Sequence, residues 1–326
     1  MLTRINTRVR FAPRILALAT LVILTAHSAL AQTRPLKLLV AFPPGGPVDF
    51  VARTLSDQLG KELNQPVLVE NKAGANGAIA ADALIKSPAD GQTLWLTSVG
   101  AVAINPTLYP ALPYKPLSDL APVSMVVNNV EMLVVNPASP ANQPGEFLNH
   151  AKSKRLSMAS SGTGSVPHLA MELLSSATQI EMTHVPYKGA APAITDVIAG
   201  HVDGFFGDIP GLIGHIKAGK LKPVALAATQ RHPLFPDVKT FEEIGVKGVD
   251  SDNWYALFAH KGTSAADLER LNKAVVKALA DPSVKSRLLA SGAVPSSSSP
   301  AELAAVLVKD SAKWSQIIKA KNIKDN

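Results

Sequence analysis

The 326-residue chain contains no cysteine at any position. That absence excludes disulfide bonds, attachment of a lipid to an N-terminal cysteine, thiol catalysis and zinc held by cysteine. A protein without disulfides must be stabilised by its core, and a chain of this length with 47% hydrophobic residues can form one. The length also exceeds what one domain usually needs, so it predicts two domains.

The chain also lacks the patterns of nucleic-acid-binding and membrane-spanning proteins. Its formal net charge is +7, but four of its arginines lie in the first 31 residues, where there is no lysine and no acidic residue. The remainder carries 28 basic and 25 acidic residues and no basic run interleaved with aromatic side chains, so nucleic-acid binding is not predicted. No segment has the roughly 18 consecutive apolar residues typical of a membrane-spanning helix.

The N-terminus has the organisation of a secretory signal peptide. The four arginines precede the apolar run 15–26, which is followed by the small-x-small sequence Ala29-Leu30-Ala31. This run is too short to cross a bilayer core of about 30 Å as a helix, but it has the length of a signal-peptide hydrophobic region. We therefore predict cleavage after Ala31 and export of the protein; the alternative is a short buried helix.

Apolar runs of strand length alternate with helical patterns along most of the chain after residue 32. Strands are predicted over 38–42, 67–69, 94–97, 132–135, 156–160, 183–185, 202–206, 224–227 and 256–259. Helices are predicted over 49–59, 76–86, 167–177, 192–199, 211–218, 265–280 and 301–319. A proline-rich stretch, 106–122, interrupts the alternation. The alternation predicts an α/β fold with mostly parallel sheets covered by helices on both faces.

Two glycine-containing turns between a predicted strand and a predicted helix are the candidate binding elements. The first turn is residues 43–49 and the second turn is residues 160–168. Glycines let a backbone approach a ligand closely, and the following helix adds unpaired N–H groups and the positive end of its dipole. Each turn is therefore predicted to bind an anion, and glycine at Gly162 and Gly164 is expected to aim the N–H groups of Ser161–Ser165. The alternative is that both are ordinary strand-to-helix turns.

Neither turn has the pattern of a nucleotide-binding loop, and no cofactor is predicted. The first lacks G-x-G-x-x-G, and the second has Pro167 where the third glycine would stand. Neither ends in the Gly-Lys-Ser/Thr sequence of a phosphate-binding loop. Ligands of open α/β sheets bind at the carboxyl ends of the strands, where both turns lie. Ser98, at the end of another predicted strand, is expected to face the same crevice.

Patterns for catalysis and metal binding are weak. The histidines show no metal-ligand spacing, and there is neither an H-E-x-x-H motif nor a G-x-S-x-G nucleophile elbow, so no metal is predicted. His168 is interpreted as a helix-start or ligand-lining group, with a general base as the alternative. Asp49 is interpreted as an N-cap, or else as a group that orders water near the ligand. Asp208 either caps the next helix or reaches the crevice, and Lys188 either meets an acidic ligand or stays solvated.

A set of short motifs recurs in a fixed order along the chain. They are 42–49, Glu70-Asn71-Lys72 with Gly74, Pro88 with Asp90-Gly91 and Thr93, Ile104-Asn105-Pro106, 160–165, His168-Leu169, 183–189 and 218–221. In this combination, and over essentially the whole chain after the signal peptide, the protein resembles the Bug-type periplasmic solute-binding proteins of tripartite tricarboxylate transporters.

The resemblance implies a two-domain α/β periplasmic binding protein, type II-like, with a hinge of two crossing strands. Domain one would be 34–135 plus 253–326 and domain two 136–252, with crossings near Val135 and Asn253-Trp254. It implies a monomeric, non-enzymatic periplasmic receptor that holds a small organic acid, partly through ordered waters, and delivers it to membrane transporter subunits. The binding residues would be Gly45, Gly46, Pro47, Val48, Asp49, Ser98, Ser161, Gly162, Thr163, Gly164, Ser165, His168 and Asp208.

One departure from that family changes the expected ligand. Many members have a small residue and then threonine or serine before the aspartate, whereas Pro47 and Val48 stand here. The first turn therefore lacks one N–H donor and one hydroxyl, which favours an aromatic or less hydroxylated acid over citrate. Two other functions remain open at this stage: a ligand sensor that signals to a histidine kinase, and a periplasmic hydrolase or lyase that uses His168 or Asp208.

Overall fold

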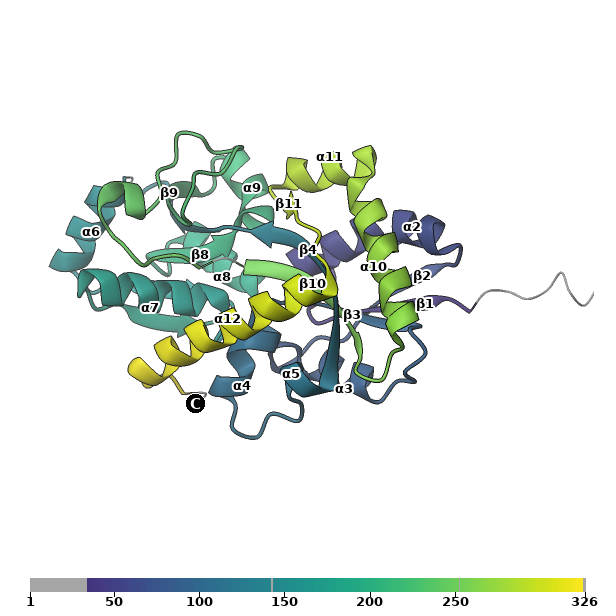
Figure 1. The fold of residues 1–326 in the computed structure, drawn as a ribbon. Coiled ribbons are helices and arrows are strands. Elements are labelled where there is room, and N and C mark those ends of the chain that lie inside the picture. Colours follow the sequence, from purple (N-terminus) through teal and green to yellow (C-terminus); the bar gives the residue numbers. More distant parts are fainter. Residues whose placement is uncertain (1–33, 142, 252, 325–326) are drawn as a thin grey trace, which may run out of the picture. The chain divides into compact units, whose positions relative to one another are not determined.

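The computed structural model describes residues 34–141, 143–251 and 253–324 (Figure 1). The predicted signal peptide and its cleavage site lie outside the described residues. From Pro35 onward the chain forms one compact unit that contains two separate β-sheets. Among the helices of the described ranges, none combines the length and apolar character that crossing a membrane requires.

The first sheet has six strands in the order β11-β4-β10-β3-β1-β2. Their bounds are Leu36–Val40 (β1), Val67–Asn71 (β2), Thr93–Ser98 (β3), Leu120–Asn129 (β4), Asn253–His260 (β10) and Val294–Pro295 (β11). β1 lies parallel to both β2 and β3, whereas β10 runs antiparallel to β3 and β4. All six residues of β3 are buried, as expected for a strand covered on both faces.

The second sheet has five strands in the order β7-β6-β8-β5-β9. Their bounds are Glu131–Val135 (β5), Ser157–Ser160 (β6), Thr183–Pro186 (β7), Gly204–Asp208 (β8) and Lys222–Ala227 (β9). β6 is parallel to β7 and β8, and β5 is antiparallel to β8 and β9. The order of the strands therefore places the carboxyl ends of β6 and β8 at one edge, where the second turn begins.

Both sheets are mixed, whereas the sequence pattern predicted mostly parallel ones. Two of the antiparallel strands, β5 and β10, are those by which the chain enters a sheet from the other one, and β11 pairs antiparallel with β4 at the edge of the first sheet. β4 leads into β5 through Val130 alone, and β10 returns to the first sheet after β9. An alternation of strands and helices predicts parallel neighbours, but it carries no information about a strand that enters a sheet from outside. The first crossing is at Val130, so residues 131–135, which were assigned to the first domain, belong to the second sheet.

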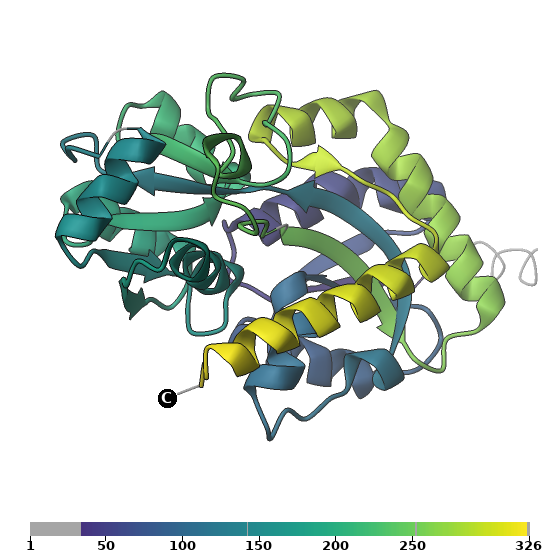
Figure 2. The ribbon, with the colours of Figure 1, turned by 60° about the vertical axis from the view of Figure 1, so that its left-hand side comes forward.

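Helices cover both faces of each sheet, as predicted. On the first sheet, one face packs against α2 (Pro47–Leu63), α10 (Ala265–Ala280) and α11 (Pro282–Ser291). The other face packs against α3 (Ala78–Ile85), a π-helix at Gly100–Ile104, α4 (Asn105–Leu108) and α12 (Pro300–Ala320). Figure 2 shows α12, in yellow, crossing this second face. α5 (Pro116–Asp119) leads into β4 and also contacts α12.

The second sheet is covered in the same way. One core cluster joins it to α6 (Pro144–Ser153) and α7 (Val166–Thr178), and the other joins it to α8 (Ala190–Ala199) and α9 (Ile209–Lys217). Two 3₁₀ turns, Ala75–Gly77 and Glu242–Ile244, complete the helical segments of the described residues. Val166 and Leu169 of α7 pack instead into the core cluster of the first sheet, which brings the second turn against α4.

β4, α6 and α11 were not predicted from the sequence. β4 contains Pro122 and Ser124 and ends in two asparagines, so it has neither an apolar run nor a clean alternation. It forms because β10 pairs with its whole length, with register shifts after Tyr255 and after Leu257 that accommodate the irregular residues. Such pairing joins segments more than a hundred residues apart, and local sequence patterns do not report it.

Candidate functional site

A cavity of about 490 Å³, here called the cleft, lies among residues of both sheets and both turns. This volume suits a small organic molecule. Its lining includes the first turn, the end of β3, the second turn, the segment before α8, the end of β8 and the starts of β5 and β10. Strand ends of the two sheets therefore meet at one place, as expected for a ligand site in α/β folds.

The cleft brings together eight of the thirteen residues that the sequence proposed for binding. These are Gly45, Gly46, Pro47, Val48, Ser98, Ser161, Ser165 and Asp208. The other five, Asp49, Gly162, Thr163, Gly164 and His168, are not among the described residues that line it. Four of these five influence the cleft indirectly, because their hydrogen bonds or packing shape the two turns. They are Asp49, Gly162, Gly164 and His168.

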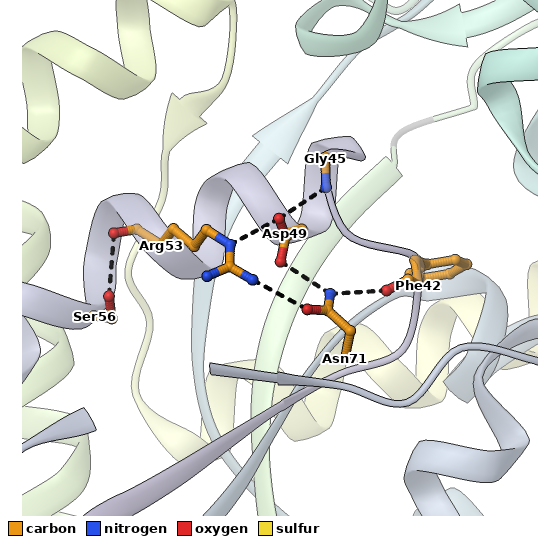
Figure 3. A network of polar contacts seen from close by, with 6 residues as sticks. All are labelled: Phe42, Gly45, Asp49, Arg53, Ser56 and Asn71. Atoms are coloured by element: carbon orange, nitrogen blue, oxygen red, sulfur yellow. Dashed lines mark hydrogen bonds and ion pairs between the residues drawn. The ribbon is translucent and has the colours of Figure 1, made fainter. Parts of the chain in front are cut away.

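Asp49 holds the first turn in place (Figure 3). Its side chain is buried, and Oδ2 accepts hydrogen bonds from the Gly45 N–H and from Nε of Arg53, both at 2.9 Å. Oδ1 accepts from Nδ2 of Asn71 at 2.9 Å, and the same Nδ2 donates to the Phe42 carbonyl at 3.0 Å. Asp49 and Asn71 together therefore tie the first turn, and Phe42 just before it, to the end of β2.

The charge of Asp49 is maintained by these donors. Burial would raise the pKa of this carboxyl, but the hydrogen bonds from Arg53, Gly45 and Asn71 outweigh burial and hold the pKa below its usual value. The interpretation of Asp49 as an N-cap is wrong, because Gly46 occupies that position of α2. Asp49 lies in the first turn of the helix instead, where its carboxylate reaches back to the backbone that precedes the cap.

The first turn presents open backbone donors to the cleft. Gly46 has no side chain, so within the described chain α2 begins without a side-chain cap. The Phe50 N–H is bonded to the Gly46 carbonyl at 2.9 Å, and Pro47 has no N–H. In a helix the N–H groups ahead of the first internal bond have no intrahelical partner, which leaves those of Val48 and Asp49 at the positive end of the dipole.

The second turn uses two of its glycine N–H groups internally. The Gly162 N–H donates to Oγ of Ser160 at 3.1 Å, and the Gly164 N–H donates to Nδ1 of His168 at 3.1 Å. The Gly162 carbonyl accepts from the Ser165 N–H and from Oγ of Ser165, at 3.1 and 2.7 Å. These two N–H groups therefore have acceptors within the turn, and the positive φ angles of Gly162 and Gly164, 134° and 74°, shape it.

The remaining donors of the second turn lie at the start of α7. Leu169 is the first residue of this helix whose N–H bonds back, to the Ser165 carbonyl at 3.1 Å. The N–H groups of Val166 and His168 precede it, and Pro167 has none. Val166, Ser161 and Ser165 line the cleft, so α7 presents its N-terminus to the cavity as α2 does.

His168 is a buried structural group beneath the second turn, not a ligand-lining one. Its ring stacks on His184 of β7 with centroids 3.7 Å apart and planes 4° from parallel. Since Nδ1 accepts from Gly164, the neutral ring carries its proton on Nε2, which lies 3.9 Å from Oε1 of Glu172. Burial, and then the neighbouring His184, lower the pKa of His168 to about 3; burial lowers that of His184 to about 4.

These two rings predict a loss of stability in acid. Both folded-state pKa values lie below the value of about 6.5 for an unfolded histidine. Below pH 6.5 the two histidines therefore bind protons in the unfolded chain but stay neutral in the folded one, which favours unfolding. At pH 5 the loss is up to about 2 kcal/mol of unfolding free energy per ring. His168→Gln should flatten the decline measured by denaturant unfolding between pH 7 and 5, whereas His201→Gln, at an exposed histidine, should not. An equal decline in all three proteins would refute this assignment.

A buried acidic cluster lies at the wall of the cleft, and sequence reasoning found only one of its members. Asp208 ends β8 and Glu131 begins β5; these two residues, called the carboxyl pair below, are register partners on adjacent strands. Tyr255 donates its hydroxyl hydrogen to Oδ2 of Asp208, and Nδ2 of Asn253 donates to Oε1 of Glu131 at 2.9 Å. All four residues line the cleft.

The carboxyl pair is held toward its protonated form. Burial, and then the charge of Asp208, raise the pKa of Glu131 well above its usual value, and burial also raises the pKa of Asp208. Asp208 occupies the N-cap position of α9, but its side chain makes no capping bond in the described chain and lines the cleft. A glutamate opening the apolar run 131–135 is the sequence signal that was overlooked, because a buried strand rarely begins with an unpaired acid.

Comparison with known proteins agrees with this geometry. A family model described as "Tripartite tricarboxylate transporter family receptor" matches residues 51–323. Protein BugT of Bordetella pertussis is 35% identical over 289 residues, which are 88% of this chain and 89% of that protein.

Two solved structures from Rhodopseudomonas palustris cover 99% of their own chains in the comparison. MatC with bound malate is 31% identical over 88% of this chain, with a TM-score of 0.80. Rpa4515 with adipate is 30% identical over 90% of this chain, with a TM-score of 0.85. The predicted family and the predicted binding-protein fold are both confirmed. The chain belongs to the tripartite tricarboxylate transporter receptor family, and it is a periplasmic solute-binding receptor rather than an enzyme.

Proposed function

We propose that this receptor captures a small organic carboxylate in the cleft, with the carboxylate between the two turns, and delivers it to the membrane subunits of its transporter. The observation that carries the proposal is that the N-termini of α2 and α7 open into one cavity. Two helix N-termini supply N–H groups and positive dipole ends where an anion would sit.

The donors of the proposed carboxylate site come from both turns. Val48 offers a backbone N–H from the first turn, and Val166 offers one from the second. Ser98 and Ser161, which carry hydroxyl groups, line the same cavity, as does Ser165, whose hydroxyl donates to the Gly162 carbonyl. Thr163 and the two glycines of the second turn lie behind these groups. The bound malate of MatC and adipate of Rpa4515 support a carboxylate ligand for the fold that this chain shares with them.

The rest of the cleft is largely apolar. Phe42, Pro43, Pro47, Ile194 and Phe205 contribute to its lining. Hydrocarbon in the ligand would be desolvated favourably against these side chains, whereas hydroxyl groups buried there without partners would oppose binding. We therefore propose a ligand with an apolar middle, aliphatic or aromatic, in preference to an acid with polar groups along its chain, such as citrate.

We further propose that the two sheets belong to two domains that close on the ligand. The segments that connect them are Val130 and the residues leading into Asn253, and the cleft lies beside both connections. A pair of crossing segments is a hinge, and closure over a ligand is then a rigid-body motion. The membrane subunits would recognise the closed, occupied state and accept the released acid.

A thermal-shift screen tests this function. The purified protein is heated with mono-, di- and tricarboxylates, aromatic acids and aminocarboxylates, with matched uncharged amides as controls. A ligand at a hundred times its Kd adds about 2.7 kcal/mol of stability, which is visible as a higher Tm. We expect at least one acid to raise the Tm while its amide does not. If no carboxylate shifts the Tm, the proposed function is wrong.

A further inference from the structure

The carboxyl pair is unexpected at the wall of a cavity proposed to hold an acid. Glu131 has no exposed surface, and its Oε2 has no hydrogen-bond partner among the described residues. Oδ1 of Asn253, which is 8% exposed, also lacks one there. Buried polar atoms are nearly always paired in folded proteins. Asn129, the register partner of Asn253 on β4, also has an unpaired Nδ2 and Oδ1 there, but it does not line the cleft. Within the cleft, a ligand with N–H donors would supply partners for the two orphan acceptors.

Two of the donors that line the cleft at this point are already used within the described chain. Tyr255 gives its hydrogen to Asp208, and the Nδ2 group of Asn253 donates to Glu131. Lys188 and His215 line the cleft as well, but in the described chain the side chains that donate to the carboxyl pair are those of Asn253 and Tyr255. The local excess of acceptors is matched by a group that carries several N–H donors and a positive charge.

The arrangement opposes folding and is therefore not explained by stability. A group whose folded-state pKa is raised favours the folded state only below the pH at which it ionises in the unfolded chain, and it opposes folding above that pH. Placing a second carboxyl directly opposite the first on the neighbouring strand adds like-charge repulsion. Uncharged side chains of the same shape would avoid both effects, so a ligand-binding role accounts better for the pair.

We infer that the ligand is an aminocarboxylate: its carboxylate binds at the two turns and its ammonium group binds at Glu131, Asp208 and Asn253. This inference rests on the proposed function and names the class of acid. Both ends fit one ligand because the turns and the carboxyl pair line the same cleft. The ammonium group supplies three donors and one positive charge, which satisfies the orphan oxygens and relieves the repulsion between the two carboxyls.

A dicarboxylate is the contrasting ligand. Its second carboxylate would lie beside the carboxyl pair, and at neutral pH one of the three acids would have to bind a proton for that contact to form. The pairs 6-aminohexanoate with adipate and 4-aminobutanoate with succinate separate the two cases, since each pair has the same number of carbons and differs only at one end. A third compound, 6-hydroxyhexanoate, tests a neutral donor.

Calorimetry on the full mature protein at pH 7.5 provides the first test. We expect 6-aminohexanoate or 4-aminobutanoate to bind at least about tenfold more tightly than its dicarboxylate partner, the effect of one charge-assisted hydrogen bond. The hydroxy acid should fall between the two. Equal or tighter binding of the dicarboxylate would overturn the inference, while leaving intact the proposal that the cleft binds carboxylates.

Isosteric variants provide the second test. Glu131→Gln and Asp208→Asn should each weaken the aminocarboxylate by about ten- to a hundredfold, and should leave the dicarboxylate unchanged or improve it. Glu269→Gln removes a carboxyl of α10 that does not line the cleft, and should change neither affinity. Without ligand, Glu131→Gln should unfold at an equal or higher temperature than the parent at pH 8. Equal weakening of both ligand classes would show that the pair acts only on structure and would refute the inference.

Discussion

Asp49→Ala is expected to lower the affinity for the captured acid by about a hundredfold or more, and to lower the free energy of unfolding by about 3 kcal/mol. The substitution removes the acceptor of three hydrogen bonds and leaves the Gly45 N–H without its buried partner. A hydrogen bond to a charged group contributes about 1.5–3 kcal/mol, and the three are not independent. Affinity falls because Gly45 and Gly46, which line the cleft, lose their fixed position.

Two milder variants separate the effect of the hydrogen bond to the first turn from the effect of the charge on Asp49. Arg53→Ala removes one partner of Asp49, but the side chain of Arg53 is 52% exposed, so the change should cost less than about 1 kcal/mol. Asp49→Asn keeps an acceptor for Gly45 and should fall between the other two. Calorimetry and urea unfolding measure both quantities on each protein. If Asp49→Ala binds like Arg53→Ala, then the network of Figure 3 does not hold the binding turn.

Gly164→Val is expected to abolish detectable binding and also to destabilise the protein by about 3 kcal/mol or more. A Cβ atom at this position would lie 1.9 Å from Cδ2 of Leu108, a buried residue of α4. The φ angle of Gly164 is also +74°, which a β-branched residue adopts only with strain. A turn that faced only the cleft would tolerate a larger side chain, but Leu108 belongs to the core cluster of the first sheet, so the new side chain would meet packed atoms.

Matched variants test whether the effect of Gly164→Val comes from the steric clash with Leu108. Gly219→Ala places a side chain at φ +67° where no atom lies within 4 Å of the new Cβ, so it measures backbone strain alone and should cost about 1 kcal/mol. Thr163→Ala neighbours Gly164 without lining the cleft and should bind nearly like the parent. Adding Leu108→Ala to Gly164→Val should recover part of the binding. Parent-like affinity in Gly164→Val alone would show that the second turn does not position the ligand.

The predicted site residues that line the cleft follow from local patterns. The first and second turns each join a buried strand to a helix, and a glycine between a strand pattern and a helix pattern is visible within ten residues of sequence. The same patterns located α10 to the residue and most other elements to within two residues. Short-range information of this kind was enough to place eight of the proposed binding residues at one cavity.

The parts that were missed depend on contacts between distant segments. Glu131 meets Asn253 across 122 residues, and Asp208 meets Tyr255 across 47, so no local pattern reveals that they form a buried cluster. The role of His168 likewise depends on its stacking with His184 of another strand. The spacing of residues along the chain predicts at which end of a strand a side chain lies. It does not predict which residue of another strand that side chain contacts.

The most direct test of the central claim is a crystal structure of the mature protein with the tightest acid from the thermal-shift screen. The account predicts that the carboxylate of the ligand lies in the cleft within about 3.2 Å of donors from both turns, directly or through one ordered water. The backbone N–H groups of Val48 and Val166 are the donors expected to contribute. A carboxylate bound beside Glu131 and Asp208 instead, or outside the cleft, would contradict the account.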